Sequence, residues 1–175
     1  MKNDPAYLLV LDALRVPEAK QICGQESIEY SLLYSNTDWA AQLANSPICI
    51  KLSLHDAVHL KWVTEKVWAS SGVIFEYENQ VERERALGIL PRNITIMGED
   101  DRMLFLRFYS PKTLIDLDEH AEQDPIDYLL GNSTTIHISP LYWDCCGFER
   151  INKTAANRFV EQCLFPTSLI EALMQ

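Results

Sequence analysis

Three short, largely apolar runs constrain the fold of this 175-residue chain more than any other feature of its sequence. They span Tyr7–Leu11, Ile48–Leu52 and Val73–Tyr77, and a polar or turn-forming residue borders each one. Runs of this length are typical of buried β-strands, because a helix needs a longer periodic segment. The sequence therefore predicts a sheet with three buried strands.

The segments between and after these runs carry helix signals. Ser53 can cap the amides of a helix over residues 54–69, whose apolar residues recur at spacings of three and four. Asn79 followed by Glu82 resembles a capping box, which predicts a helix reaching Leu90. Strands thus alternate with helices in the first half of the chain.

A hairpin is predicted next. Residues 94–97 and 103–108 are apolar and flank the polar turn Gly98-Glu99-Asp100-Asp101. Because side chains alternate along a strand, Arg107 and Tyr109 should lie on one side of the second strand and Phe108 on the other.

Helix signals dominate the rest of the chain. Pro111 can begin a short helix, and Asp124 can cap another that ends before Gly131. A strand is expected over residues 134–138. From Asn152 the sequence reads as helical to its last residue, with an interruption at Pro166.

These elements predict an α/β (α+β) fold in which helices flank a mixed β-sheet. We expect one adaptor-sized domain over residues 1–139 and a short helical segment over residues 140–175 packed on it. No repeat or linker divides the chain.

Charge and cysteine content exclude several classes of function. The chain has 15 Lys and Arg against 25 Asp and Glu, a net charge of −10, so it lacks the cations that a nucleic-acid-binding protein needs. No apolar stretch is long enough for a membrane span, and the first residues do not resemble a secretory signal. The five cysteines are odd in number and irregularly spaced, which argues against a disulfide framework. A cytoplasmic location is expected.

Catalytic patterns are scarce. The six glycines form no phosphate-binding loop, and no G-x-S-x-G elbow is present. Asp12 ends the first predicted strand, where α/β enzymes often hold a catalytic carboxylate, but no second carboxylate follows it closely. We interpret Asp12 as a strand-end cap or as the partner of Arg15.

Two further groups of residues are candidate metal or redox sites. His55 and His59 lie four residues apart and could share a metal on one helix face, although no further ligand cluster accompanies them. Cys145 and Cys146 lie near His137 and Asp144, but adjacent cysteines lack the spacing that places two thiolates on one ion. A solvated helix face and core packing are favoured, and no cofactor or metal is predicted. A small metal-dependent hydrolase using the histidine pair stays an alternative.

Acidic and aromatic residues offer candidate contact surfaces. An acidic run without Lys or Arg is either a solvated face or a docking surface for a basic partner segment. For each tryptophan a core position is favoured, yet one exposed aromatic patch can form. The acids are Asp116, Asp118, Glu119, Glu122, Asp124 and Asp127, and the tryptophans are Trp39, Trp62, Trp68 and Trp143.

Several short motifs occur in a fixed order along residues 5–135. They are Y-L-L-V-L-D-A from Tyr7, Y-S-L-L-Y-S-N-T from Tyr30, A-N-S-P-I-C-I-K-L from Ala44, W-A-S-S-G-V-I-F from Trp68 and L-F-L-R-F-Y-S-P-K-T-L from Leu104. This series resembles the adaptor/chaperone family of bacterial type VI secretion systems, formerly a domain-of-unknown-function family encoded beside toxic effectors. The last motif is the most specific.

The resemblance implies a non-enzymatic function. Members bind a cognate effector, keep it soluble and help to load it onto the VgrG or PAAR spike. An immunity-type protein that binds and neutralises a toxin is the main alternative. The candidate protein-binding residues are Arg107, Tyr109, Lys112, Asp116, Asp118, Glu119, Glu122 and Trp68. An internal ion pair with a nearby acid is the competing interpretation of Arg107.

Departures from the family pattern point to a divergent partner. Ser110 and Lys112 stand where the family usually has Asp and Arg, and Glu84 interrupts a helix that is usually basic. The region after Ser139 is shorter than the helical lobe of many members, which implies a reduced or differently shaped cargo-binding lobe.

Overall fold

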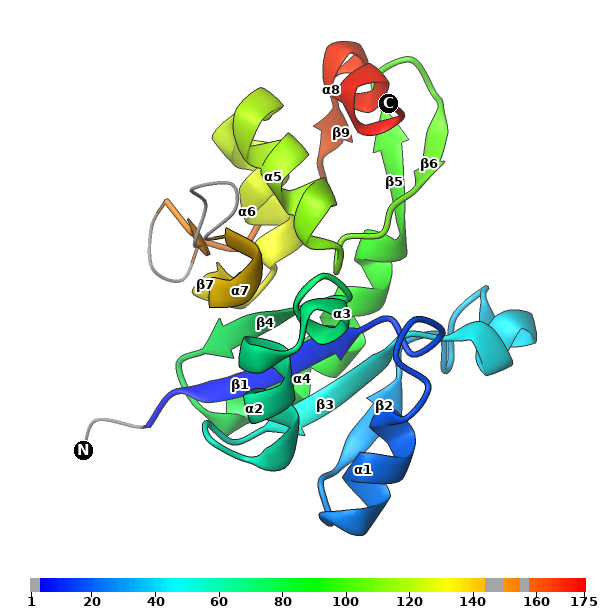
Figure 1. Cartoon of the computed structure of the whole chain (residues 1–175). Helices are drawn as coiled ribbons and strands as arrows, with labels where there is room; N and C mark the ends of the chain where they lie inside the picture. Colours follow the sequence, from blue (N-terminus) through cyan, green and yellow to red (C-terminus); the bar gives the residue numbers. More distant parts are fainter. Residues whose placement is uncertain (1–3, 144–149, 155–157) are drawn as a thin grey trace.

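The computed structural model describes residues 4–143, 150–154 and 158–175, which form an α+β fold with two sheets (Figure 1). The main sheet has six strands in the order β2-β3-β1-β4-β7-β8, and every neighbouring pair is antiparallel. The strands are β1 (Ala6–Leu11), β2 (Tyr30–Leu32), β3 (Ile48–Leu52), β4 (Gly72–Tyr77), β7 (Thr135–His137) and β8 (Arg150–Asn152).

The three apolar runs form the centre of this sheet, as predicted. In β1, Leu9 pairs with Ile50 of β3 on one side and with Ile74 of β4 on the other. Leu8 and its same-face neighbours belong to one buried cluster, whereas Leu9 and its neighbours belong to a second. Both faces of the strand are therefore covered, which explains why the run is continuously apolar instead of alternating.

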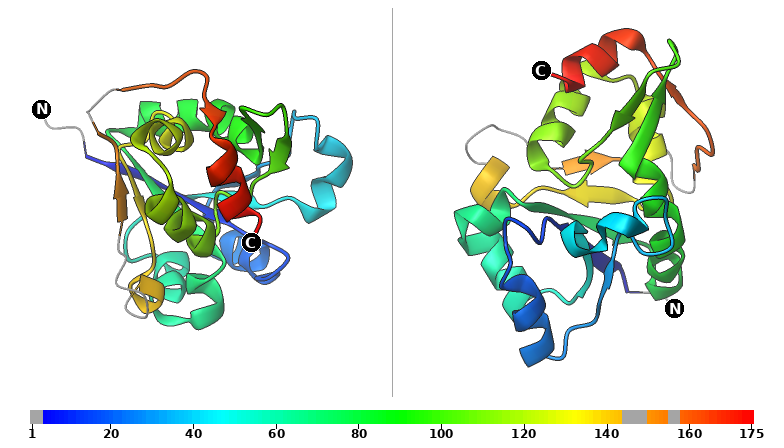
Figure 2. Two further views of the ribbon diagram at one scale, coloured as in Figure 1. Left: turned by 90° about the horizontal axis from the view of Figure 1, so that it is seen from above. Right: turned by 90° about the vertical axis from the view of Figure 1, so that its right-hand side faces the viewer.

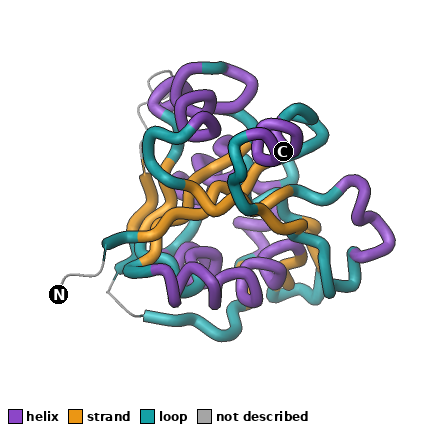
Figure 3. The backbone as a smooth tube through the Cα atoms, turned by 90° about the horizontal axis from the view of Figure 1, so that it is seen from below, coloured by secondary structure: helices purple, strands orange, loops and turns teal. Residues whose placement is uncertain are grey.

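Helices cover both faces of the main sheet. On one face lie α1 (Ala19–Gln25), α2 (Ala57–Thr64) and α3 (Lys66–Ala69), and on the other lie α4 (Gln80–Ile89), α5 (Pro111–His120) and α6 (Gln123–Leu130). Figure 3 shows the strands running between helices on two sides. Short helical turns occur at η1 (Ala40–Asn45), η2 (Leu90–Ile94) and α7 (Pro140–Trp143). In the described part of the chain, no helix is both long and apolar enough to cross a membrane.

The predicted hairpin is confirmed, and it forms part of a small second sheet with mixed strand directions. Its order is β6-β5-β9, with β5 (Thr95–Gly98) antiparallel to β6 (Met103–Phe105) and parallel to β9 (Leu164–Phe165). Helix α8 (Thr167–Leu173) follows β9. The right-hand view of Figure 2 shows this sheet and α8 above the main sheet.

The prediction of helix from Asn152 onwards is wrong before Pro166. Residues 158–163 are not helical, and the C-terminal region supplies β8 to the main sheet and β9 to the small one. Among the described residues from Arg150 onwards, only α8 is helical. The apolar anchors of these strands, Ile151 and Phe165, are buried single residues, so their segments are too short to show a strand period.

Helix starts differ from the predictions in two places. Asp56, not Ser53, caps α2, because its carboxylate accepts from the backbone N–H of His59 at 2.8 Å. The single helix expected over residues 54–69 is broken at Glu65, whose backbone is extended. By contrast, the predicted cap of α4 is confirmed, with Asn79 accepting from the N–H of Glu82 at 3.0 Å.

Helix α6 begins slightly earlier than expected. Its N-cap residue is Glu122, so Asp124 lies within the first turn instead of capping it. The predicted stop is confirmed at Gly131, whose φ of 60° and ψ of −123° suit glycine.

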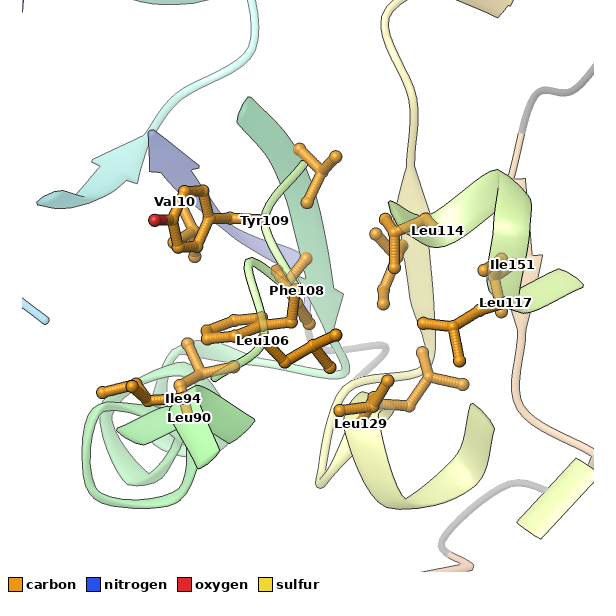
Figure 4. Packing of buried hydrophobic residues seen from close by; sticks show 14 of the residues in the cluster. Val10, Leu90, Ile94, Leu106, Phe108, Tyr109, Leu114, Leu117, Leu129 and Ile151 are labelled. Carbon is orange, nitrogen blue, oxygen red and sulfur yellow. The ribbon is translucent and has the colours of Figure 1, made fainter. Parts of the chain in front are cut away.

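The segment after β6 is anchored in the larger core. Leu106 and Phe108 are buried between helix α4 with η2 on one side and helices α5 and α6 on the other (Figure 4). Phe108 also meets the ring of Phe75 from β4 edge to face, with ring centroids 6.1 Å apart. This anchoring fixes the position of Arg107 between them.

Candidate partner-binding surface

Asp12 ends β1 and organises the chain around it. Its Oδ1 accepts from the N–H groups of Leu14 at 3.0 Å and Arg15 at 3.4 Å, which confirms the strand-end cap. Its Oδ2 accepts from Arg107 at 2.5 Å. The alternative pair with Arg15 is not formed, since that guanidinium donates to the carbonyl and hydroxyl oxygens of Ser70 at 2.8 and 3.0 Å.

Arg107 does not lie on a strand. Strand β6 ends at Phe105, so the prediction that Arg107 and Tyr109 share a strand face is wrong. The chain turns instead, and the N–H of Ser110 donates to the carbonyl of Arg107 at 2.9 Å. The internal ion pair with Asp12 is confirmed, yet 48% of the Arg107 side chain stays exposed. A partner can therefore reach a guanidinium that is already held in place.

Two tyrosines pack beside this ion pair. The guanidinium carbon of Arg107 lies 5.9 Å from the centre of the Tyr109 ring, and the Tyr109 and Tyr34 side chains interact. Burial, followed by the neighbouring Tyr34, raises the pKa of Tyr109 to about 12. Burial and then the Asp12 charge raise the pKa of Tyr34. Both phenols stay neutral, and we call Asp12, Tyr34, Arg107 and Tyr109 the β1-end cluster.

The β1-end cluster unites segments that are far apart in the sequence. Asp12 comes from the first motif of the resemblance, Tyr34 from the second, and Arg107 and Tyr109 from the last. The motif that begins at Trp68 also reaches it, because the N–H of Asp12 donates to the carbonyl of Ser71 at 2.8 Å. Four of the five motifs thus meet at one place in the fold.

A second candidate surface lies on α5 and the start of α6. Three carboxylates, Asp118, Glu119 and Glu122, are exposed and form no ion pair with any described residue. Partial burial and then the charge of Glu119 raise the pKa of Asp118. We call these three residues the acidic ridge. The neighbouring Asp116 is instead neutralised by Lys112 at 2.7 Å.

The last two acids of the run have an internal role. Arg158 contacts Asp124 closely and lies 3.2 Å from a carboxylate oxygen of Asp127. Asp127 is fully buried and also accepts from Gln123 at 2.8 Å and from the Thr154 hydroxyl at 3.1 Å. Both carboxylates therefore hold the C-terminal region against α6; Asp127 is not available for a partner, whereas the ion-paired Asp124 stays 64% exposed.

Trp68 is a core residue, as favoured for each tryptophan, and its place among the candidate contact residues is wrong. Its side chain is fully buried beneath α3, and its indole N–H donates to Glu18 at 3.1 Å. Tyr109 is also almost fully buried, so its contribution is to position Arg107. Among the tryptophans whose side chains are described, only Trp39 is partly exposed; its ring lies edge-on to Phe105 with centroids 4.9 Å apart. The side chain of Trp143 lies outside the described residues.

The two histidines, His55 and His59, are hydrogen-bonded to each other. His59 Nδ1 accepts from the backbone N–H of His55 at 3.0 Å, and burial lowers the pKa of His59. Residues 4–143, 150–154 and 158–175 contain no group of three or more His, Cys, Asp or Glu side chains that could hold a metal. Asp144, Cys145 and Cys146 lie outside this description.

Sequence reasoning missed one polar pair. Glu76 on β4 and His137 on β7 lie 2.6 Å apart and, with Tyr7, line a cavity of about 310 Å³. Strand pairing across the sheet brings the two residues together, and the signal for Glu76 is a single acid within the otherwise uncharged strand β4.

One family model matches residues 7–127, that of a domain of unknown function, DUF4123. The chain belongs to this family. The DUF4123 segment begins in β1 and ends within α6, so it contains the whole β1-end cluster and the acidic ridge. Strands β7, β8 and β9 and helix α8 lie beyond it. No curated protein and no solved structure matches the chain.

Proposed function

We propose that this DUF4123 protein is a non-enzymatic adaptor/chaperone of a bacterial type VI secretion system. It binds a cognate toxic effector in the cytoplasm and assists its loading onto a VgrG or PAAR spike protein. The observation that carries the proposal is the meeting of the motif segments in the β1-end cluster of a DUF4123 chain. These motifs are also the basis of the resemblance to the secretion adaptors.

The arrangement suits recognition of another protein. The Arg107 side chain is about half exposed and Asp12 already orients its guanidinium, so less rotamer freedom is lost when a partner carboxylate or carbonyl binds it. The acidic ridge lies on α5 and α6, which follow the Arg107 segment directly. A partner with a basic segment would meet complementary charge there, which favours fast and selective association.

Co-purification with the proteins encoded by neighbouring genes tests the proposal. The adaptor should retain an effector and a spike protein, and it should leave the toxicity of the effector intact. Retention of a toxin with loss of its toxicity would instead support the immunity-type alternative. If neither an effector nor a spike protein is retained, the adaptor proposal is wrong.

Arg107→Glu is the matched site variant, because it reverses the exposed charge of the β1-end cluster. Arg85→Glu is its control, since Arg85 is exposed on α4 and, among the described residues, its ion-pair partner is Glu82 three residues away. Effector or spike retention should fall with the first variant and not with the second. If the two variants retain the partner equally well, Arg107 is not part of the contact surface.

A further inference from the structure

One face of the small sheet is apolar and open. Met97, Met103, Phe105 and Leu164 share this face through the pairs Met97–Met103 and Met97–Leu164 and the alternation along β6. All four side chains are exposed, Met103 to 67% and Leu164 to 59%. The opposite face is covered, as Phe165 is buried and the Gly98 position faces Ile170 of α8. Contiguous apolar surface of this kind marks an interaction site.

The backbone of β6 is open along the same region. The N–H of Gly98 donates to the carbonyl of Arg102 at 2.8 Å, and the N–H of Leu106 donates to the carbonyl of Ile94 at 2.8 Å. Because bonded pairs alternate in an antiparallel ladder, Leu104 directs its N–H and C=O toward β5, whereas Met103 and Phe105 direct theirs outward. Figure 1 shows β6 at the rim of the molecule with β5 on its inner side.

Acidic residues lie at both ends of this strand. Glu99 and Asp101 are exposed in the turn that precedes Met103, and Asp38 is exposed next to Trp39, whose ring meets Phe105. The two arginines that border β6 are each held by an acid: Arg102 by Asp100 at 2.5 Å and Arg107 by Asp12 at 2.5 Å. The strand therefore combines an apolar face with negative charge at its ends.

We propose that β6 is a strand-addition site for an extended segment of the cargo protein. That segment carries apolar side chains at alternate positions and Lys or Arg at its flanks. Its backbone pairs with the outward N–H and C=O groups of Met103 and Phe105, its apolar residues extend the Met97–Phe105 face, and its cations meet the acids at both ends. This inference deepens the proposed adaptor function by naming the cargo chemistry and the element that receives it.

A synthetic peptide tests the site without a known cargo. The probe is fluorescein-labelled Lys-Lys-Val-Thr-Ile-Thr-Val-Lys-Lys, and its control has Glu at all four flanking positions. Binding to the full chain is followed by fluorescence anisotropy. The Lys-flanked peptide should bind saturably and the Glu-flanked peptide should bind far more weakly. Absence of saturable binding, or equal binding of the two peptides, overturns the proposal.

Two variants and one control locate the binding. Met103→Lys places a charge on the open face. Met103→Pro removes the outward N–H of residue 103 and leaves the hydrogen bonds to β5 in place. Each variant should raise the Kd of the probe about tenfold or more. Val81→Lys, a similarly exposed site on α4, should leave it unchanged. Circular dichroism confirms that each variant is folded. Unchanged affinity in a folded Met103 variant overturns the proposal.

Amide exchange by NMR adds a readout at single residues. In the free chain the N–H groups of Met103 and Phe105 should exchange quickly and that of Leu104 slowly; the probe should protect the first two. If the probe slows amide exchange only at residues outside β6, the proposal is overturned. It is also overturned if the chain forms a dimer without the probe and Met103→Lys dissociates that dimer, because the edge then binds a second copy. If the chain binds the probe but retains no cargo protein in co-purification, the adaptor function is wrong and β6 is still a strand-addition site.

Discussion

The ion pair between Asp12 and Arg107 makes a residue-scale prediction about stability. Arg107→Ala leaves the largely buried Asp12 carboxylate without its cation, and we expect the free energy of unfolding to fall by about 1–2 kcal/mol. Arg85→Ala removes a more exposed pair and should cost about 0.5 kcal/mol or less. Urea denaturation monitored by circular dichroism measures both. Equal small effects would mean that the Asp12 pair contributes no more than a surface contact.

Buried thiols and phenols predict a loss of stability at alkaline pH. Burial raises the pKa of Cys49 from 9.0 to about 12, and that of Cys23 from 9.0 to about 11. Burial likewise raises that of Tyr109 from 10.0 to about 12. Above pH 9 the unfolded chain releases these protons while the folded chain retains them, so the free energy of unfolding should fall as the pH rises from 9 toward 12.

Urea unfolding at a series of pH values between about 8 and 11 measures this slope. Cys49→Ala should flatten it, although the variant starts from a lower stability because the side chain is buried. If the free energy of unfolding does not change with pH in this window, the prediction that burial raises the pKa of these groups is wrong.

At the scale of single elements, the close approach of β1 and β4 depends on Gly72. A Cβ there would lie 2.5 Å from the carbonyl oxygen of Val10. Gly72→Ala should therefore lower the free energy of unfolding by about 2–4 kcal/mol, because the central ladder must open. Gly88, in exposed helix α4, has nothing within 4 Å of such an atom. Gly88→Ala should instead raise stability by about 0.5–1 kcal/mol. Thermal unfolding of the two variants should show shifts of opposite sign.

Elements with strong local signals were predictable from the sequence. Strands β1, β3 and β4 are largely apolar, with Lys51 and Glu76 as their charged residues, and the Asn79 cap of α4 is decided by residues within one turn. What local patterns did not determine is how strands pair. The all-antiparallel order of the main sheet and the two-residue strand β9 depend on contacts between distant segments.

The candidate site shows the same division. The motifs identified Arg107 and the acidic run, but the partner of Arg107 is 95 residues away, so no spacing rule could find it. Trp68 was misassigned because a tryptophan on a short helix carries no signal of which face is buried. Asp127 was grouped with surface acids for a similar reason: Arg158, which neutralises it, lies in a segment that the sequence predicted as helix.

At the scale of the whole molecule, the acidic ridge predicts how partner binding responds to salt. Neutralising it with Asp118→Asn, Glu119→Gln and Glu122→Gln should weaken binding of a basic partner and flatten the salt dependence of its Kd. The matched control neutralises three exposed acids elsewhere, Asp4→Asn, Glu26→Gln and Glu78→Gln. Isothermal titration of the co-purified partner at several ionic strengths measures the change. If the ridge and control variants behave alike, the three acids form a solvated face and do not contribute to partner binding.

The C-terminal region predicts the outcome of truncation. A chain ending at residue 139 lacks β8, β9 and α8, so the face of the small sheet around Ile96 loses its cover. We expect this fragment to aggregate or to unfold without a cooperative transition, which differential scanning calorimetry would reveal. A cooperative, soluble fragment would support residues 1–139 as a domain that folds on its own.

The parallel pairing of Met97 in β5 with Leu164 in β9 also has a consequence for biosynthesis. A ribosome releases β5 and β6 well before it has made β9, so one edge of β5 waits unpaired while the intervening residues emerge. Closing so long a loop is slow compared with forming the hairpin next to it. During that interval β5 is an exposed edge strand, whereas in the finished protein it lies between β6 and β9, so crowded or fast synthesis should favour misassembly at β5.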